Sequence, residues 1–260
     1  MSNDPGPRPA PSAPSPAIHL RDGGLMLGGR MIFRHLTLAA AGGRITCLLG
    51  PSGAGKSSLL RLIAGLATGE GEILADDGQP VAGRIAWMGQ QDLLLPWASV
   101  LDNVMLGAKL RGNRAGPAAR DRALALLAHV GLADRAACRP DALSGGMRQR
   151  VALARTLFED RPIVLMDEPF SALDAITRLR LQDLAAGLLA GRTVLMVTHD
   201  PMEALRLGHQ VLVLSGRPAR LSNPIQPPGD SPRPPDHPAL LSLQGRLLAQ
   251  LRGAVGEDAA

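Results

Sequence analysis

Aromatic residues are scarce in this chain of 260 residues, which has three phenylalanines, two tryptophans and no tyrosine. Proteins that bind single-stranded nucleic acid stack bases on aromatic side chains set among basic ones. The sequence has neither such a stripe nor a run of lysine and arginine, so a solvated, arginine-rich surface explains its net charge of +5. We therefore predict no nucleic-acid partner.

Cysteine and long apolar runs are also lacking. Cys47 and Cys138 are too few for a disulfide framework and fit reduced thiols in a cytosolic setting. No stretch approaches the roughly 20 apolar residues that span a bilayer, and residues 1–16 lack the apolar segment of a signal peptide. Membrane association is therefore expected to come through a partner.

Lysine occurs only twice, and one of the two marks the most informative segment. Residues 50–57 match the phosphate-binding pattern G-x-x-x-x-G-K-[ST], in which Lys56 is the lysine. The apolar run 44–49 predicts a buried strand before this loop, and apolar residues at helical spacing predict a helix over 56–66. A chance glycine-rich turn would not come with this strand, loop and helix.

The loop therefore predicts a nucleotide site. Its glycines let backbone N–H groups turn onto phosphate oxygens, and the next helix points its positive end at them. Lys56 should bridge the β- and γ-phosphates, and the Ser57 hydroxyl should bind Mg²⁺. The predicted nucleotide-binding residues are Gly50, Pro51, Ser52, Gly53, Ala54, Gly55, Lys56, Ser57 and Ser58.

Two adjacent acids end a second predicted strand, over residues 163–166. Charges at a buried strand end need a cation. Asp167 should hold Mg²⁺ directly or through water, and Glu168 should act as general base on the attacking water. A solvated acidic loop explains the pair taken alone, but not the pair together with a phosphate loop.

Two other segments point to phosphate chemistry. Ser144, Gly145 and Gly146 precede a predicted helix over 147–157, where a capping serine and exposed N–H groups would form a second phosphate site. An ordinary capped helix explains the serine but not the two glycines. His199 follows a predicted strand over 193–197, at the sheet edge where ligand sites of α/β proteins gather.

Taken in order, these motifs make residues 18–215 resemble the ATP-binding subunit of an ATP-binding cassette (ABC) transporter. The matching segments are the Walker A loop 50–57, the Q-loop glutamine Gln90, the signature 143–149, Walker B 163–168, the D-loop 171–174 and the switch histidine His199. The resemblance implies ATP and Mg²⁺ as cofactors. It also implies ATP hydrolysis coupled to transport across a membrane.

The resemblance assigns further roles. Gln90 would sense Mg²⁺ and the attacking water, and His199 would contact the γ-phosphate and hold the water and Glu168 in place. The signature would close over ATP held by a second copy of the chain, forming an ATP sandwich. The implied residues acting in trans are Ser144, Gly145, Gly146 and Gln149; Asp174 is the D-loop acid, and Ser57, Gln90 and Asp167 contact Mg²⁺.

The implied fold is an α/β P-loop core of ABC ATPase type over 18–215, with an N-terminal antiparallel β-subdomain and a helical subdomain inserted at about 98–142. Residues 1–17 are predicted to be a disordered, proline-rich tail, and 216–260 a proline-rich tail with a short helix over 240–251. Where the family often stacks an aromatic residue on adenine, this chain has Leu27, with Phe33 nearby. We expect apolar contact from Leu27 or a shifted loop.

Two functional classes are open: a transporter subunit, and a soluble non-transport ABC ATPase acting on nucleic acid. The single cassette and the absence of a heptad array between Lys56 and Leu143 favour the transporter. The segment Leu94-Leu-Pro-Trp97 resembles bacterial importers of nitrate, sulfonates, taurine and thiamine precursors such as hydroxymethylpyrimidine. Core packing or a groove for a permease helix would explain its apolar residues.

These inferences place the chain peripherally on the cytoplasmic face of the inner (plasma) membrane. Its expected partners are a second copy of itself and integral membrane permease subunits, with a periplasmic solute-binding protein acting indirectly.

Overall fold

Two β-sheets form the frame of the protein, whose computed structural model describes residues 15–112 and 116–257. The first sheet is antiparallel, in the order β2-β1-β4, and consists of β1 (Ile18–Leu27), β2 (Arg30–Ala40) and β4 (Glu70–Ala75). The second has the order β5-β6-β7-β3-β8-β9 and is parallel except for the β8–β9 pair. Its strands are β3 (Ile45–Leu49), β5 (Ile85–Met88), β6 (Ile163–Asp167), β7 (Thr193–Val197), β8 (Gln210–Ser215) and β9 (Arg220–Leu221).

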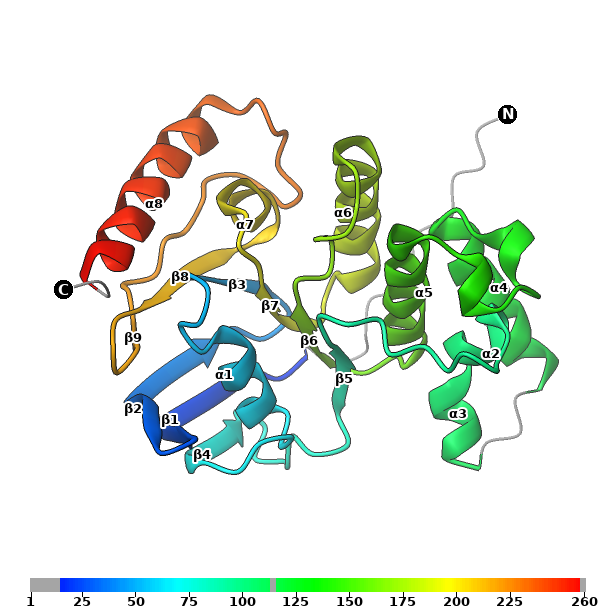
Figure 1. Ribbon diagram of the computed structural model, residues 1–260, viewed down its shortest axis with the longest axis horizontal. Helices are drawn as coiled ribbons and strands as arrows, with labels where there is room; N and C mark the ends of the chain where they lie inside the picture. The colour runs from blue at the N-terminus through cyan, green and yellow to red at the C-terminus, as the bar shows by residue number, and fades with distance from the viewer. Residues whose placement is uncertain (1–14, 113–115, 258–260) are drawn as a thin grey trace.

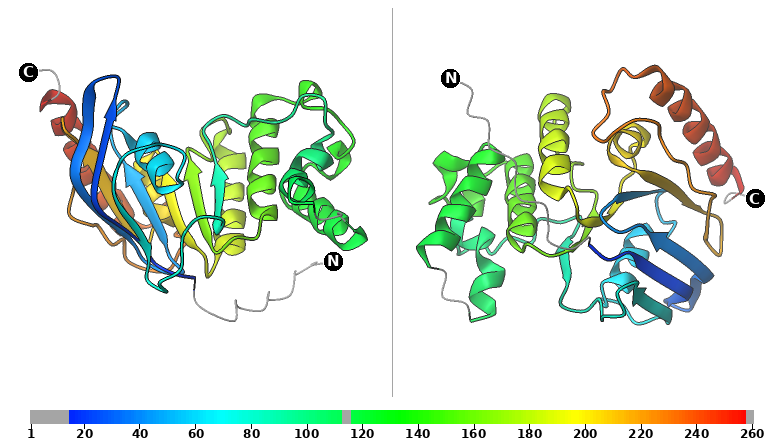
Figure 2. Two further views of the ribbon diagram at one scale, coloured as in Figure 1. Left: turned by 90° about the horizontal axis from the view of Figure 1, so that it is seen from below. Right: turned by 180° about the vertical axis from the view of Figure 1, so that it is seen from behind.

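Helices cover the parallel sheet and extend beyond it (Figure 1). They are α1 (Lys56–Ile63), α2 (Val100–Val104), α3 (Leu106–Leu110), α4 (Pro117–His129), α5 (Gly145–Phe158), α6 (Ala175–Leu189), α7 (Pro201–Leu207) and α8 (Pro238–Glu257), with 3₁₀ turns at Ala133–Arg135 and Pro140–Ala142. Both views of Figure 2 place α2–α5 at one end of the molecule and α8 at the other. None of the helices in the described residues is both long and apolar enough to cross a bilayer.

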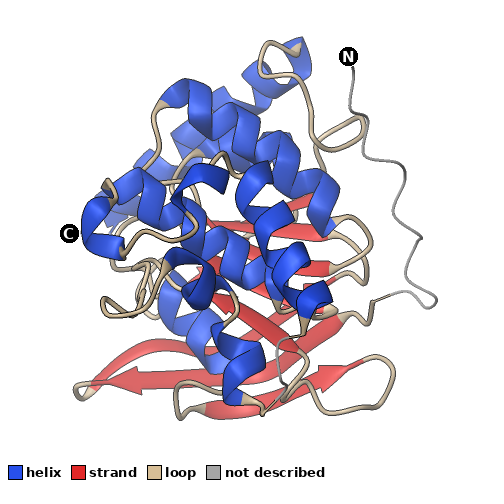
Figure 3. Cartoon of the chain, turned by 90° about the vertical axis from the view of Figure 1, so that its right-hand side faces the viewer, coloured by secondary structure: helices blue, strands red, loops and turns tan. Residues whose placement is uncertain are grey.

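The central strands are apolar on both faces, which is why they form the middle of a covered sheet. In β3, Cys47 and Leu49 face the core shared with α5–α8, whereas Leu48 faces the core shared with α1 and the antiparallel sheet. Strands β6 and β7 alternate in the same way, with Val164 and Leu165 on opposite faces. The result is a layered α/β molecule, as Figure 3 shows, and the predicted fold class is confirmed.

The predicted N-terminal tail extends too far into the chain. Ser15 is buried, the Pro16 carbonyl accepts a hydrogen bond from Thr193 Oγ1 (2.7 Å), and Ala17 N donates to Asp76 Oδ1 (2.9 Å). Residues 15–17 are therefore part of the folded unit, because they satisfy polar groups of two sheets. The rest of the predicted tail, residues 1–14, lies outside the described residues.

The C-terminal segment also differs from the prediction of an extended tail with a short helix. Helix α8 has 20 residues and packs against α7. The stretch before it is fixed by Arg233, whose side chain is buried and donates to six backbone carbonyls, those of Leu205, Arg206, Gly208, Pro227, Pro228 and Gly229. The proline content indicated an extended segment, but it could not reveal that Arg233 fixes this segment to the core.

Candidate functional site: a nucleotide-binding and hydrolysis site

The phosphate loop connects β3 to α1 with backbone that only glycine tolerates at two points. Gly50 has φ +157° and a Cβ there would lie 2.2 Å from the Leu214 carbonyl oxygen. Gly55 has φ +94° and a Cβ there would meet Ile32 Cγ2 at 2.4 Å. Since both positions are left-handed and crowded, the loop keeps a tight curl that ends at the N-terminus of α1.

Lys56 begins α1 and its ammonium group lies inside this curl. The side chain is buried, and Nζ donates to the carbonyl oxygens of Gly50 and Pro51, both at 2.8 Å. Burial lowers the pKa of Lys56, while the carboxylates of Glu168 and Asp167 raise it. The cation is thus held within the loop at the N-terminus of α1, an arrangement suited to phosphate.

Asp167 ends β6 and is 1% exposed. Burial raises its pKa, and a hydrogen bond with the Ser57 side chain lowers it. Its Oδ1 is buried and has no hydrogen-bond partner among the described residues. A buried carboxylate oxygen without a partner, next to a hydroxyl, suits a hard cation such as Mg²⁺. Among the described residues, no three or more His, Cys, Asp and Glu side chains form a group that could hold a metal ion.

Glu168 brings the other two predicted catalytic residues together. Its Oε2 accepts a hydrogen bond from Gln90 Nε2 (3.4 Å) and lies 3.3 Å from His199 Nδ1. Gln90, Glu168 and His199 follow β5, β6 and β7, which are adjacent parallel strands, so their carboxyl ends meet at one edge. Glu168 has φ +50°, an unusual backbone for glutamate, and its N–H donates to the Val197 carbonyl (2.9 Å).

The signature segment caps α5 as predicted from the serine. Ser144 Oγ accepts a hydrogen bond from Met147 N (3.3 Å), and Ser144 and Gly145 are exposed. Gly146 packs closely on the D-loop, since a Cβ there would lie 3.1 Å from the Ala172 carbonyl oxygen. The exposed part of this helix start is therefore free to meet another molecule, while its inner side contacts its own chain.

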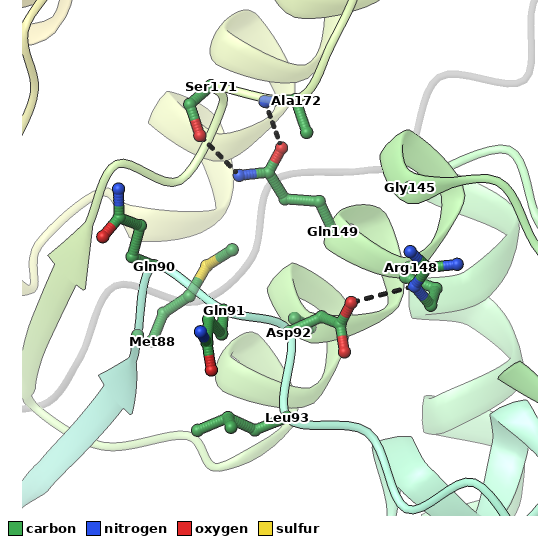
Figure 4. A pocket seen from close by; sticks show the side chains of 12 residues that line it. Met88, Gln90, Gln91, Asp92, Leu93, Gly145, Arg148, Gln149, Ser171 and Ala172 are labelled. Carbon is green, nitrogen blue, oxygen red and sulfur yellow. Dashed lines mark hydrogen bonds and ion pairs between the residues drawn. The ribbon is translucent and has the colours of Figure 1, made fainter.

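Gln149, which was predicted to act in trans, faces inward within its own chain. Its side chain is 6% exposed, and Nε2 donates to the Glu168 carbonyl (2.9 Å) and to Ser171 Oγ (3.3 Å). Its Oε1 accepts from Ala172 N (2.8 Å), and Figure 4 shows the bonds to residues 171 and 172. Its membership of the signature segment did not reveal that the side chain faces inward; the role in trans stays a prediction.

Asp174, the D-loop acid, is exposed and caps α6. Its Oδ1 accepts from Thr177 N (3.0 Å), and this bond lowers the pKa of Asp174. A helix-capping role is sufficient to explain the acid within one copy of the chain.

Three side chains that the sequence analysis missed fix the loop after Gln90. Arg148 Nε donates to Asp92 Oδ2 (3.0 Å), as Figure 4 shows, and Arg155 donates to the carbonyls of Asp92 (2.5 Å) and Leu93 (2.9 Å). Fully buried Asn103 accepts from Leu95 N (2.7 Å) and donates to the Leu95 carbonyl (3.1 Å). The two arginines are seven residues apart, two turns of α5, which is the one signal that the sequence offered.

The exposure of side chains near the site bears on the contact to adenine and on the role of the apolar residues after Gln90. Phe33 is fully buried in the core, so it offers no platform for adenine, whereas Leu27 is 48% exposed at the β1–β2 hairpin. Trp97 is 71% exposed and Leu93 is 61% exposed, while Leu94 packs against the core. Core packing therefore accounts for part of the apolar cluster but not for the tryptophan.

Comparisons with known proteins give this site a family. Residues 33–171 match the family model of the ABC transporter. The chain is 45% identical over 242 residues to an uncharacterized ABC transporter ATP-binding protein of Haemophilus influenzae, an alignment that covers 91% of this chain and 99% of that protein. The chain therefore belongs to the ABC transporter family, and it is an ABC-type ATPase.

The chain is also similar to a sulfonate import subunit and to a solved ATP-binding cassette. An aliphatic sulfonates import ATP-binding protein, SsuB 2 of Burkholderia cenocepacia, is 42% identical over 253 residues, which cover 95% of this chain and 92% of that protein. The solved structure of the ATP-binding cassette MJ0796, a dimer in a post-hydrolysis state bound to ADP and Pi, superposes with a TM-score of 0.72 at 31% identity. That match covers 82% of this chain and all of the other.

Proposed function

We propose that the chain is the ATP-hydrolysing subunit of a bacterial importer of a small solute, working as a dimer with Mg²⁺·ATP between the copies. The observation that carries the proposal is the meeting of Gln90, Glu168 and His199 at the carboxyl ends of β5, β6 and β7, the last of which lies beside β3, the strand that leads into the phosphate loop. Two side chains from separate segments converge on the carboxylate of a third segment, which a purely structural role does not require.

Each residue of the site has its own role in ATP binding or hydrolysis. Lys56 and the loop N–H groups bind the phosphates, and Ser57 and Asp167 would hold Mg²⁺, which offsets phosphate charge when bound. Glu168 takes the proton of the attacking water, and Gln90 and His199 fix the carboxylate and the water. Ser144 and the exposed start of α5 supply N–H donors to ATP held by the second copy.

Similarity supports the solute class. The SsuB 2 relative imports aliphatic sulfonates by name, so a sulfonate is the first solute to test, ahead of nitrate, taurine and hydroxymethylpyrimidine. We place the chain on the cytoplasmic face of the inner membrane, attached to permease subunits that a periplasmic solute-binding protein supplies. The exposed Trp97 beside the Q-loop is the contact that we assign to the permease.

Substitution of Glu168 by glutamine tests the chemistry. An amide of the same size keeps the phosphate loop intact but cannot accept the proton, so hydrolysis should fall by roughly 10²–10⁴-fold while ATP binding persists. The variant should also accumulate as an ATP-bound dimer, measured by size-exclusion chromatography with and without ATP. His35→Gln, on the exposed edge of β2, is a control that should turn over normally. Near wild-type hydrolysis by Glu168→Gln would disprove the base assignment.

A further inference from the structure

The start of α5 is exposed on one side, where another molecule can bind, and on its other side it contacts the backbone that follows Glu168. Ser144 caps the helix and is exposed, and five residues later Gln149 is buried against the segment 168–172. The pocket of about 430 Å³ in Figure 4 lies between this helix start, the D-loop and the loop that follows β5.

We propose that Gln149 is a positioning residue for the general base of its own subunit, because it fixes the backbone that presents Glu168. The inference rests on the proposed function, in which Glu168 is the base. It assigns to Gln149 a role in cis, whereas Ser144 at the same helix start acts in trans.

The hydrogen bonds at Gln149 carry the argument. A glutamine amide offers two donors and an acceptor, and here one donor reaches the Glu168 carbonyl, the other reaches Ser171 Oγ, and the acceptor takes Ala172 N–H. The three bonds tie the residue to both ends of the turn that follows the base. Ser171 Oγ also donates to the Glu168 carbonyl (3.1 Å), which completes a closed set of bonds.

The backbone at Glu168 requires such support. Its φ of +50° is rare for a side chain with a Cβ and persists only where neighbours hold it. On one side its N–H is bonded to Val197, and on the other side its carbonyl is bonded to Gln149. If the Gln149 bond is lost, the Glu168 carbonyl keeps only its bonds from Ser171, so the peptide after Glu168 is held less firmly and the carboxylate is less well fixed against Gln90 and His199.

Ser144 and Gln149 both belong to the start of α5, so a movement of this helix affects both residues. Five residues of helix correspond to a rise of about 7.5 Å, so the trans contact and the cis support lie on neighbouring turns. Gly146, between them, packs against the Ala172 carbonyl with no room for a side chain. A shift of α5 when Ser144 engages the partner's ATP therefore reaches the base of the same subunit, which couples the two sites of the dimer.

Gln149→Glu is the first test, performed on the purified full-length chain. The carboxylate keeps the acceptor for Ala172 N–H but loses the donor to the Glu168 carbonyl and places charge against it. We expect kcat to fall by at least about tenfold, because misplacing a reacting group is costly, with the Kd for ATP within about threefold of wild type. Gln91→Glu adds the same charge to the same pocket from an exposed position and should leave both values near wild type.

Gln149→Met covers the case in which the buried charge prevents folding, since it removes the same donor without adding charge. Melting temperature is measured for each variant. A drop in melting temperature with kcat per folded molecule unchanged would overturn the proposal and leave Gln149 as a purely structural residue.

Mixed dimers separate cis from trans. Chains with two different tags are co-expressed, and the doubly tagged dimer is purified. Lys56→Ala paired with Ser144→Arg leaves one composite site without either change, so hydrolysis persists there. Lys56→Ala paired with Gln149→Glu leaves no intact site if Gln149 acts in cis, because the remaining phosphate loop belongs to the chain with the misplaced base.

We therefore expect the Gln149 mixed dimer to hydrolyse ATP at least about tenfold more slowly than the Ser144 mixed dimer. Equal rates in the two mixed dimers would overturn the proposal, because they would place Gln149 in trans. Failure of the base assignment appears elsewhere, as hydrolysis by Glu168→Gln, so the two outcomes are distinguishable.

Discussion

Replacement of Arg233 by methionine should loosen the whole C-terminal segment from the α/β core. The guanidinium is 3% exposed and lies at the C-terminal end of α7, where it donates to the carbonyls of Leu205, Arg206 and Gly208. Its other bonds reach residues 227–229, so one side chain joins the last turn of α7 to the segment before α8. Methionine keeps most of the volume and removes every donor.

The size of the effect follows from the burial of the groups that remain. Burial already lowers the pKa of Arg233, so the folded protein holds this cation at a cost that the carbonyl bonds and the nearby charge of Asp230 offset. A buried acceptor that loses its hydrogen bond typically costs about 1–3 kcal/mol, so with several carbonyls losing their donor at once we expect a loss of about 3–5 kcal/mol. For a domain of this size each kcal/mol lowers the melting temperature by roughly 2–4 °C, which gives a fall of roughly 6–20 °C.

Thermal denaturation followed by circular dichroism measures this fall, and limited proteolysis shows where the chain opens. Arg246→Met on the exposed face of α8 is the matched control and should melt close to wild type. Cleavage of Arg233→Met is expected between residues 216 and 238 before any cut in the core. A melting temperature within about 2 °C of wild type would refute the reasoning, since surface substitutions alone produce changes that small.

Two further predictions concern pH and the membrane partner. Burial raises the pKa of Glu203 to about 7, so between about pH 4.5 and 7 the folded protein binds more protons than the unfolded chain. The free energy of unfolding should therefore fall as pH rises through that window, by up to roughly 3 kcal/mol. Urea denaturation at pH 5 and pH 7.5 measures this loss; Glu203→Gln, which mimics the protonated acid bonded to Gln182, should lose less, and an equal loss in both proteins would contradict it. Trp97→Ala should leave the melting temperature and ATP binding unchanged, because the side chain is largely exposed, but weaken pull-down of the permease or transport; a large drop in melting temperature would instead show that Trp97 is a core residue.

Local patterns were sufficient to predict the frame of the site. The apolar runs at 45–49, 163–167 and 193–197 are strands in the structure because residues buried on both faces leave little alternative. The glycine pattern around Lys56 predicted a loop that needs left-handed backbone, and Gly50 and Gly55 have it. These features depend on neighbouring residues in the chain, which is the information that a sequence displays directly.

Long-range partners were not predictable in the same way. Gln149 and Glu168 are 19 residues apart, and Arg233 and Leu205 are 28 apart, so no periodicity links them. In the strand order β5-β6-β7-β3-β8-β9, β3 lies between β7 and β8 instead of before β5, and this insertion brings the phosphate loop beside the edge that Gln90, Glu168 and His199 share.

The sequence by itself determined the chemistry of this protein: a phosphate loop, an acid pair, a switch histidine and a signature serine. Only the tertiary structure decided which of these side chains meet, and it placed Gln149 against the backbone of residues 168–172 of its own chain. The physical reason is that a motif fixes residue types and local backbone, whereas the direction of a side chain depends on which distant groups need its hydrogen bonds.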